Sequence, residues 1–135
     1  AGLVAITPAA GFVGPMPALI IGIGAGIICY LAVELLLKLN IDDALAVFGV
    51  HGIGGVWGAI ATGLFVGIGF GALDVGRGEQ VLNQIIGIVA TLVWSFVATS
   101  VILLAIKFTI GLRAEQSDEE AGLDQSIHGE EAYTS

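Results

Sequence analysis

Between Ala44 and Phe70 the chain carries a single ionisable side chain, His51. An uncharged apolar run of this length is typical of a helix that crosses a bilayer. The composition agrees, because 56% of the residues are hydrophobic and 12% are charged, whereas soluble domains carry about 25% charged residues. Mean hydropathy is +0.99. The sequence therefore predicts an all-α integral membrane protein, a polytopic bundle of helices.

Prolines, glycines and charged residues divide the chain into spans and connections. The GPMP sequence after the first apolar run predicts a turn, and GFGALDVGRGEQ predicts a solvated loop. The predicted segments are 1–13, the end of a transmembrane helix; 18–38, a transmembrane helix; 44–66, the transmembrane helix that bears His51; 67–80, an extracytoplasmic loop; 81–110, a transmembrane helix; and 111–135, a cytoplasmic tail.

The positions of the basic residues predict the orientation. Lys38, Lys107 and Arg113 fall on one side of the membrane if the spans alternate, and Arg77 falls alone on the other side. An excess of Lys and Arg marks the cytoplasmic side, so we expect the C-terminus in the cytoplasm of a multi-pass cell membrane protein. The tail carries most of the net charge of -8, since residues 113–135 hold seven acidic side chains and one basic one.

His51 lies deep within its predicted span. Nine residues separate it from Asp42, which at about 1.5 Å per residue is roughly 13 Å, close to half of an approximately 30 Å hydrocarbon core. An ionisable group at that depth is expensive and marks a candidate functional site. The structural alternative is a histidine that only hydrogen-bonds a neighbouring helix. Imidazole can donate at one nitrogen and accept at the other, which suits proton handling.

Helical spacing gives His51 four neighbours on its own face: Val47, Phe48, Gly54 and Gly55. This face would present an imidazole among apolar or absent side chains, which is a poor site for a hydrated ion. Glycines also recur at one-turn spacing, in Gly22-x-x-x-Gly26 and Gly54-x-x-x-Gly58. Such pairs predict close helix packing, although they could also leave room for a conducted molecule.

Several function classes are disfavoured. The single cysteine, Cys29, can form no intrachain disulfide and belongs to no metal-ligand motif, so we expect neither metal nor cofactor. No nucleophile with a nearby base and no phosphate-binding loop appears, which argues against an enzyme. With four Lys and Arg residues, the chain is not expected to bind nucleic acid.

Three stretches resemble the ammonium transporter family, which includes the methylammonium permeases and the Rhesus glycoproteins. They are DDALAVFGVHGIGGVWGAIATGLF, the preceding AGLVAITPAAGFVGPMPALIIGIGAG, and the tail GLRAEQSDEEAGLDQSIHGEEAY. The resemblance implies a homotrimer of eleven-helix subunits, each with a narrow hydrophobic pore lined by two histidines near mid-membrane. His51 matches the second histidine. We predict that His51 and Val47 line the pore, with Phe48, Gly54 and Gly55 packed beside it.

The chain holds about three and a half of the eleven spans that the family implies. We therefore interpret it as the last part of the fold, either a fragment or one piece of a split subunit, that relies on the remaining helices of the transporter. The resemblance also implies that the tail folds against the cytoplasmic face and takes part in regulation, with a PII-type signalling protein as a partner in some members. His128 in this tail is expected to be structural.

Three functions remain open at this point. The first is transport of ammonium or ammonia through the histidine-lined pore. The second is a Rhesus-like electroneutral gas channel, and the third is a non-transporting ammonium sensor or structural subunit. The sequence does not decide whether the net transported species is a cation or a gas.

Overall fold

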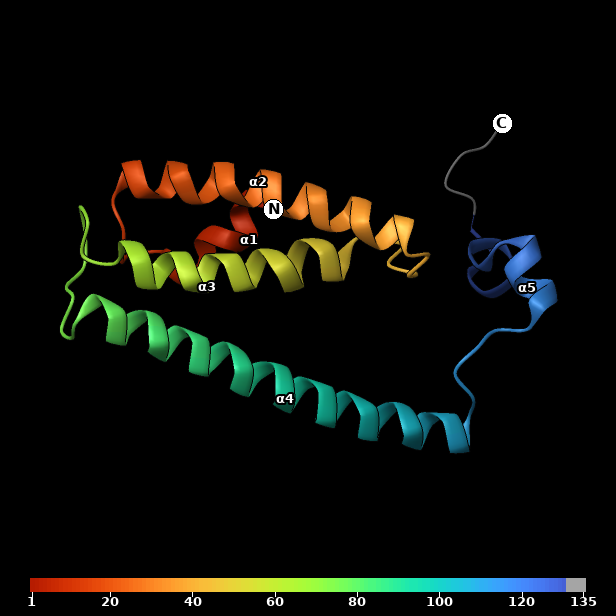
Figure 1. Ribbon diagram of the computed structural model, residues 1–135. Helices are drawn as coiled ribbons and strands as arrows, with labels where there is room; N and C mark the ends of the chain where they lie inside the picture. The colour runs from red at the N-terminus through yellow and green to blue at the C-terminus, as the bar shows by residue number, and fades with distance from the viewer. Residues whose placement is uncertain (131–135) are drawn as a thin grey trace. The chain divides into compact units, whose positions relative to one another are not determined.

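The structure, a computed structural model, describes residues 1–130, and the described part of the chain is helical without strands (Figure 1). The end of the predicted tail, 131–135, lies outside the described residues. The elements are α1 (Gly2–Ile6), the 3-10 helix η1 (Thr7–Ala9), α2 (Pro15–Lys38), the π-helix η2 (Phe48–Gly52), α3 (Ile53–Phe65), α4 (Arg77–Thr109), α5 (Gln116–Ala121) and the π-helix η3 (Asp124–His128).

Three helical segments are long and apolar enough to cross a membrane: Pro15–Lys38, Phe48–Phe65 and Arg77–Thr109. The last of these has 33 residues, which at about 1.5 Å per residue gives roughly 50 Å, well beyond an approximately 30 Å hydrocarbon core. Its polar first turn and its basic end can therefore lie in the headgroup regions.

The observed helices begin at other residues than the sequence predicts. The GPMP sequence does not form a turn but starts α2 at Pro15, because proline is well tolerated in the first helical turn, where its missing N–H has no partner to lose. The His51 segment becomes helical at Phe48 rather than at residue 44. In contrast, α4 starts at Arg77, four residues before the predicted residue 81.

The chain forms two compact units, Ala1–Val93 and Trp94–Ser135. In the first unit the short α1 lies between α2 and α3, which run side by side (Figure 1). Their contact surface consists mainly of small side chains, so the helix backbones approach closely. The buried cluster contains Ala5, Ala9, Val13, Ile21, Ala25 and Ala61.

Glycines mediate the closest helix contacts of this unit, although only one of the two predicted pairs does so. A Cβ built on Gly58 would collide with the carbonyl group of Ala5, and one built on Gly54 would lie 3.0 Å from Cys29 Sγ. Gly22 and Gly26, in contrast, face open space within the described residues. The glycine of α2 that packs is Gly24, which lies under the indole ring of Trp57.

Hydrogen bonds reinforce this packing. Trp57 Nε1 donates to the carbonyl of Ile21 at 3.0 Å, which joins α3 to α2. At the far end of α3, the Arg77 guanidinium donates to the carbonyls of Leu64 and Val66. These carbonyls end a helix and lack partners in the helix itself, so a cation there satisfies them and also interacts favourably with the helix dipole. Arg77 thus joins the start of α4 to the end of α3.

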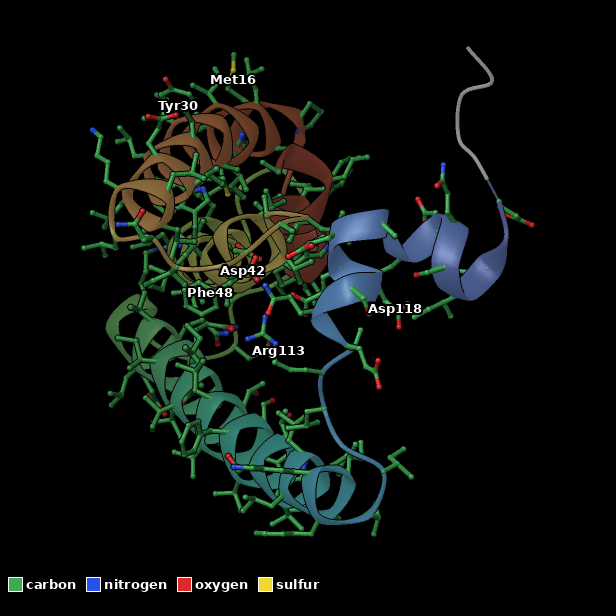
Figure 2. All side chains as sticks on the ribbon, turned by 90° about the vertical axis from the view of Figure 1, so that its right-hand side faces the viewer. Met16, Tyr30, Asp42, Phe48, Arg113 and Asp118 are labelled. Atoms are coloured by element: carbon green, nitrogen blue, oxygen red, sulfur yellow. The ribbon has the colours of Figure 1, made fainter. Side chains whose placement is uncertain are left out.

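Large apolar side chains are exposed along α2 and α4. Figure 2 shows Met16 and Tyr30 pointing outward from α2, and they are 70% and 65% exposed. Such faces are suited to lipid or to further membrane helices. In the second unit, the ion pair of Arg113 with Glu119, 3.3 Å apart, is solvent-exposed, and such pairs contribute little to stability.

Candidate transport site around His51

The helix that carries His51 is capped by Asp43. The Asp43 carboxylate accepts hydrogen bonds from the backbone N–H groups of Phe48, at 3.2 Å, and Gly49, at 3.0 Å. A helix start has N–H groups without intrahelical partners, and an acidic side chain at this end also interacts favourably with the helix dipole. The hydrogen bond from Gly49 is the main cause that lowers the pKa of Asp43 below its ordinary value of 3.8. The cap therefore remains ionised at neutral pH.

A tight bend lies between Asp43 and the first turn of the helix that it caps. Ala46 has a φ of 51°, in the left-handed region, and its N–H donates to the Asp43 carbonyl at 2.7 Å. This bend brings the carboxylate back over the first turn of the helix. Asp42, the neighbouring acid, makes no side-chain hydrogen bond or ion pair within the described residues.

His51 belongs to the π-helix η2 and not to the regular α-helix that follows. In a π-helix the hydrogen bonds run from residue i to i+5, and such turns occur frequently at functional sites. One side of this segment is fixed against α2. A Cβ on Gly49 would lie 2.7 Å from Val33 Cγ2, and the Cys29 thiol donates to the Val50 carbonyl at 3.7 Å.

His51 itself is exposed within the described residues and lines two hollows. The hollow on the α1 side has a volume of about 560 Å³ and is lined by His51, Gly55, Leu3, Val4, Thr7 and Pro8. The hollow on the α4 side has a volume of about 320 Å³ and is lined by His51, Gly52, Gly55, Val56, Ala59, Ile88, Thr91 and Leu92. Both belong to the unit Ala1–Val93.

The walls of these hollows offer few polar groups beside the imidazole. The Thr7 hydroxyl already donates to the Leu3 carbonyl at 2.8 Å, and Thr91 supplies a second hydroxyl. No group of three or more His, Cys, Asp or Glu side chains that could hold a metal ion occurs among the described residues. Chemically, the imidazole can offer a hydrogen bond or accept a proton within largely apolar surroundings.

The structure separates the residues that helical spacing grouped with His51. Gly55 lines both hollows with the imidazole. Gly54 is buried, and a Cβ built on it would lie 3.7 Å from Val4 Cγ1, so this glycine belongs to the packing side of the helix. Val47 and Phe48 line neither hollow, and the Phe48 ring lies against Gly52 instead. The π-turn accounts for this, because it shifts residues 47 and 48 away from the α-helical positions assumed for them.

Sequence reasoning missed several residues of the site. Asp43 could have been recognised, since an acidic residue shortly before a helical run is a common cap. No local pattern could have found Thr7 or Thr91, because they come from other elements and approach His51 only in the tertiary structure.

Comparison with known proteins decides the family. The profile described as "Ammonium Transporter Family" matches residues 1–133. The chain belongs to this family. The resemblance seen in the sequence is thereby confirmed, and so is the expectation of a transporter-type rather than an enzyme-type family.

Individual relatives of the ammonium transporter family agree. An ammonium transporter of Bacillus subtilis is 48% identical over 139 residues, which cover 98% of this chain and 34% of that protein. The ammonium transporter Amt1 of Archaeoglobus fulgidus is 42% identical over 137 residues, covering 99% of this chain and 35% of its own length. The chain thus spans about a third of the length of these relatives.

A solved structure confirms the all-α membrane fold. The crystal structure of Saccharomyces cerevisiae Mep2 superimposes with a TM-score of 0.74 at 38% sequence identity, over 86% of this chain and 29% of that one. Together with the three candidate spans, this similarity identifies the chain as a multi-pass helical part of an ammonium transporter fold.

Proposed function

We propose that this chain supplies about a third of an ammonium transporter and that His51 lines its conduction path. The observation that carries the proposal is the environment of the imidazole, the only ionisable side chain between Phe48 and Phe65, which is exposed and borders two largely apolar hollows. An ionisable group in a membrane span is expected to face the protein interior or a substrate path. Membership of the ammonium transporter family supplies the substrate.

The apolar walls favour the neutral form of the substrate. Charged groups are strongly disfavoured in a low-dielectric passage, so ammonium gives up one proton on entry and crosses the passage as ammonia. His51 accepts or donates a hydrogen bond to the passing molecule and can hold the released proton on its free ring nitrogen. Gly55 lies beside the imidazole and Gly54 on the packing side, whereas Val47 and Phe48 line neither hollow.

The second histidine of the pair comes from helices of the same transporter outside these 135 residues. The complete subunit assembles as a homotrimer in the cell membrane, with the tail after Thr109 in the cytoplasm. There the acidic tail regulates transport, and a PII-type signalling protein is the candidate partner. These assignments extend the family resemblance to this chain.

The test is methylammonium uptake by the complete transporter, meaning the subunit that contains these residues. His51→Ala is expected to lower uptake by about ten- to a hundredfold, because removal of one hydrogen-bonding group in a dry site costs roughly 1.4 to 3 kcal/mol. The matched control is His128→Ala, which removes the other histidine of the chain, in η3. Unchanged uptake, pH dependence and selectivity in His51→Ala would contradict the proposal that His51 lines the conduction path.

Electrical recording separates this function from the alternatives. A transporter that moves the proton together with ammonia gives an ammonium-dependent current, whereas a Rhesus-like gas channel carries none. A sensor or structural subunit would show neither current nor uptake, and deletion of the tail would alter signalling only.

A further inference from the structure

Gly55 is the one residue besides His51, among the described residues, that lines both hollows. It follows the histidine by four positions, in the first turn of α3. The lining residues of both hollows belong to the unit Ala1–Val93. The lack of a side chain at position 55 therefore leaves more room in both hollows beside the imidazole.

Neither the backbone nor the packing of the described residues requires glycine at this position. The φ of Gly55 is not positive, so alanine could adopt the same helical conformation. A Cβ built there would meet no heavy atom of the described residues within 4 Å. Glycine inside a helix is also less favourable than alanine. The reason for a glycine must therefore lie in the hollows or outside these 135 residues.

Two neighbouring glycines of α3 show the contrast. Gly54 and Gly58 are buried, whereas Gly55 is half-buried. A Cβ on Gly54 would lie 3.0 Å from Cys29 Sγ, and one on Gly58 would collide with the carbonyl group of Ala5. These two glycines permit the close approach of other helical segments. Gly55 makes no such approach within the described part of the chain, and it borders the hollows instead.

We propose that Gly55 is a size filter: it sets the width of the passage beside His51 and so limits the size of the substrate that passes. This inference rests on the proposed function. Ammonia has a single heavy atom and methylamine has two, so methylamine needs room for one further carbon beside the imidazole. Non-bonded carbon atoms keep about 3.5 to 4.0 Å apart, and a methyl group on residue 55 would extend about 1.5 Å from its Cα. Gly55→Ala should therefore hinder methylamine more than ammonia.

The experiment compares Gly55→Ala with Gly26→Ala in the complete transporter. Gly26, in α2, also has no heavy atom of the described residues within 4 Å of a built Cβ, but it lines neither hollow. Maximal uptake rates are measured for ammonium, by its depletion from the medium, and for radiolabelled methylammonium. Gly55→Ala is expected to lower the ratio of methylammonium to ammonium uptake about tenfold, the lower end of the effect of one carbon in an apolar pocket. Gly26→Ala leaves this ratio unchanged.

Thermal unfolding of the same variants in detergent separates the size filter from a packing role. Gly55→Ala should keep the melting temperature of the unmodified transporter, because its methyl group meets no atom of the described residues. A lower melting temperature, or failure of this variant to reach the membrane, would show that residue 55 packs against a helix outside these 135 residues and would overturn the proposal. An unchanged ratio of the two uptake rates, or an equal fall in both rates, would overturn it as well.

The outcomes also distinguish the size filter from the proposed function. Should the unmodified transporter take up neither substrate, the transport function itself would be refuted. Should it take up both, with the same ratio in Gly55→Ala, only the role of Gly55 would be refuted. A lower ratio in Gly55→Ala, together with unaffected uptake in His51→Ala, would support the size filter and contradict the role of His51.

Discussion

At the scale of single residues, Asp43 and His51 differ in what they contact at the start of their helix. Asp43 fixes where the helix begins, because its carboxylate satisfies the N–H groups of Phe48 and Gly49. His51, two residues after Gly49, is exposed within the described residues and borders both hollows. A capping residue and the proposed pore residue thus lie eight positions apart, and only the second could be chosen from its depth in the predicted span.

Loss of the Asp43 cap should lower the melting temperature of the complete transporter. We expect the largest effect for Asp43→Ala and a smaller one for Asp43→Asn, because the amide keeps one acceptor oxygen. The pKa of Asp43 is lowered in the folded protein, so its contribution is fully present above the ordinary value of 3.8 and is lost as the pH falls through the lower, folded value. The difference between Asp43→Ala and the unmodified protein should therefore be constant from about pH 5 to 8 and shrink in stronger acid.

Thermal unfolding followed by circular dichroism in detergent measures this effect. Asp42→Ala is the control, since Asp42 makes no side-chain hydrogen bond or ion pair within the described residues. An equal loss of stability in both alanine variants would contradict the capping role of Asp43.

At the scale of the elements, the helices were predictable from length and hydropathy, but their packing glycines were not. One-turn spacing marked Gly22 and Gly26 as strongly as Gly54 and Gly58. In the structure the first pair faces open space, and Gly24 packs under Trp57. The spacing of small residues shows that two backbones can approach each other, whereas the rotation of each helix decides which glycines lie at the contact.

Gly58→Ala should destabilise the transporter, because the new methyl group would meet the backbone of Ala5, which cannot move aside as a flexible side chain could. Overpacking of this kind costs about 1 to 3 kcal/mol. Gly26→Ala is the matched substitution on α2, where no heavy atom of the described residues lies within 4 Å of the new Cβ. Chemical or thermal unfolding of both variants measures the difference. Equal stability of the two variants would show that the contact of α1 with α3 is looser than described.

At the scale of the whole molecule, the positions of the basic residues predict the orientation in the membrane. The 33 residues of α4 exceed the thickness of an approximately 30 Å hydrocarbon core. If the tail is cytoplasmic, the loop before α4 is expected to face the exterior.

Cysteine labelling in intact cells tests this orientation. Cys29 is buried, only 2% exposed, so it should react slowly with a membrane-impermeant maleimide. Gly76→Cys, in the exposed loop before α4, is expected to be labelled from outside. For Ser117→Cys, in α5, permeabilisation should raise the rate of labelling about tenfold or more. The reason is that the charged reagent cannot cross the hydrocarbon core to reach a cytoplasmic tail. Labelling of Ser117→Cys from outside would reverse the predicted orientation.

The sequence by itself determined the membrane environment, the helical fold class, the family resemblance and the selection of His51 as the candidate site residue. Hydropathy, charge and the depth of a lone imidazole in its span are all properties that can be read along the chain. The tertiary structure decided which side chains line the hollows together with that imidazole: Thr7, Thr91 and Gly55 do so, and Val47 and Phe48 do not. The physical reason is the π-turn and the rotation of each helix about its axis. Both are set by contacts between distant segments, such as Cys29 with Val50 and Trp57 with Ile21, and no local pattern encodes them.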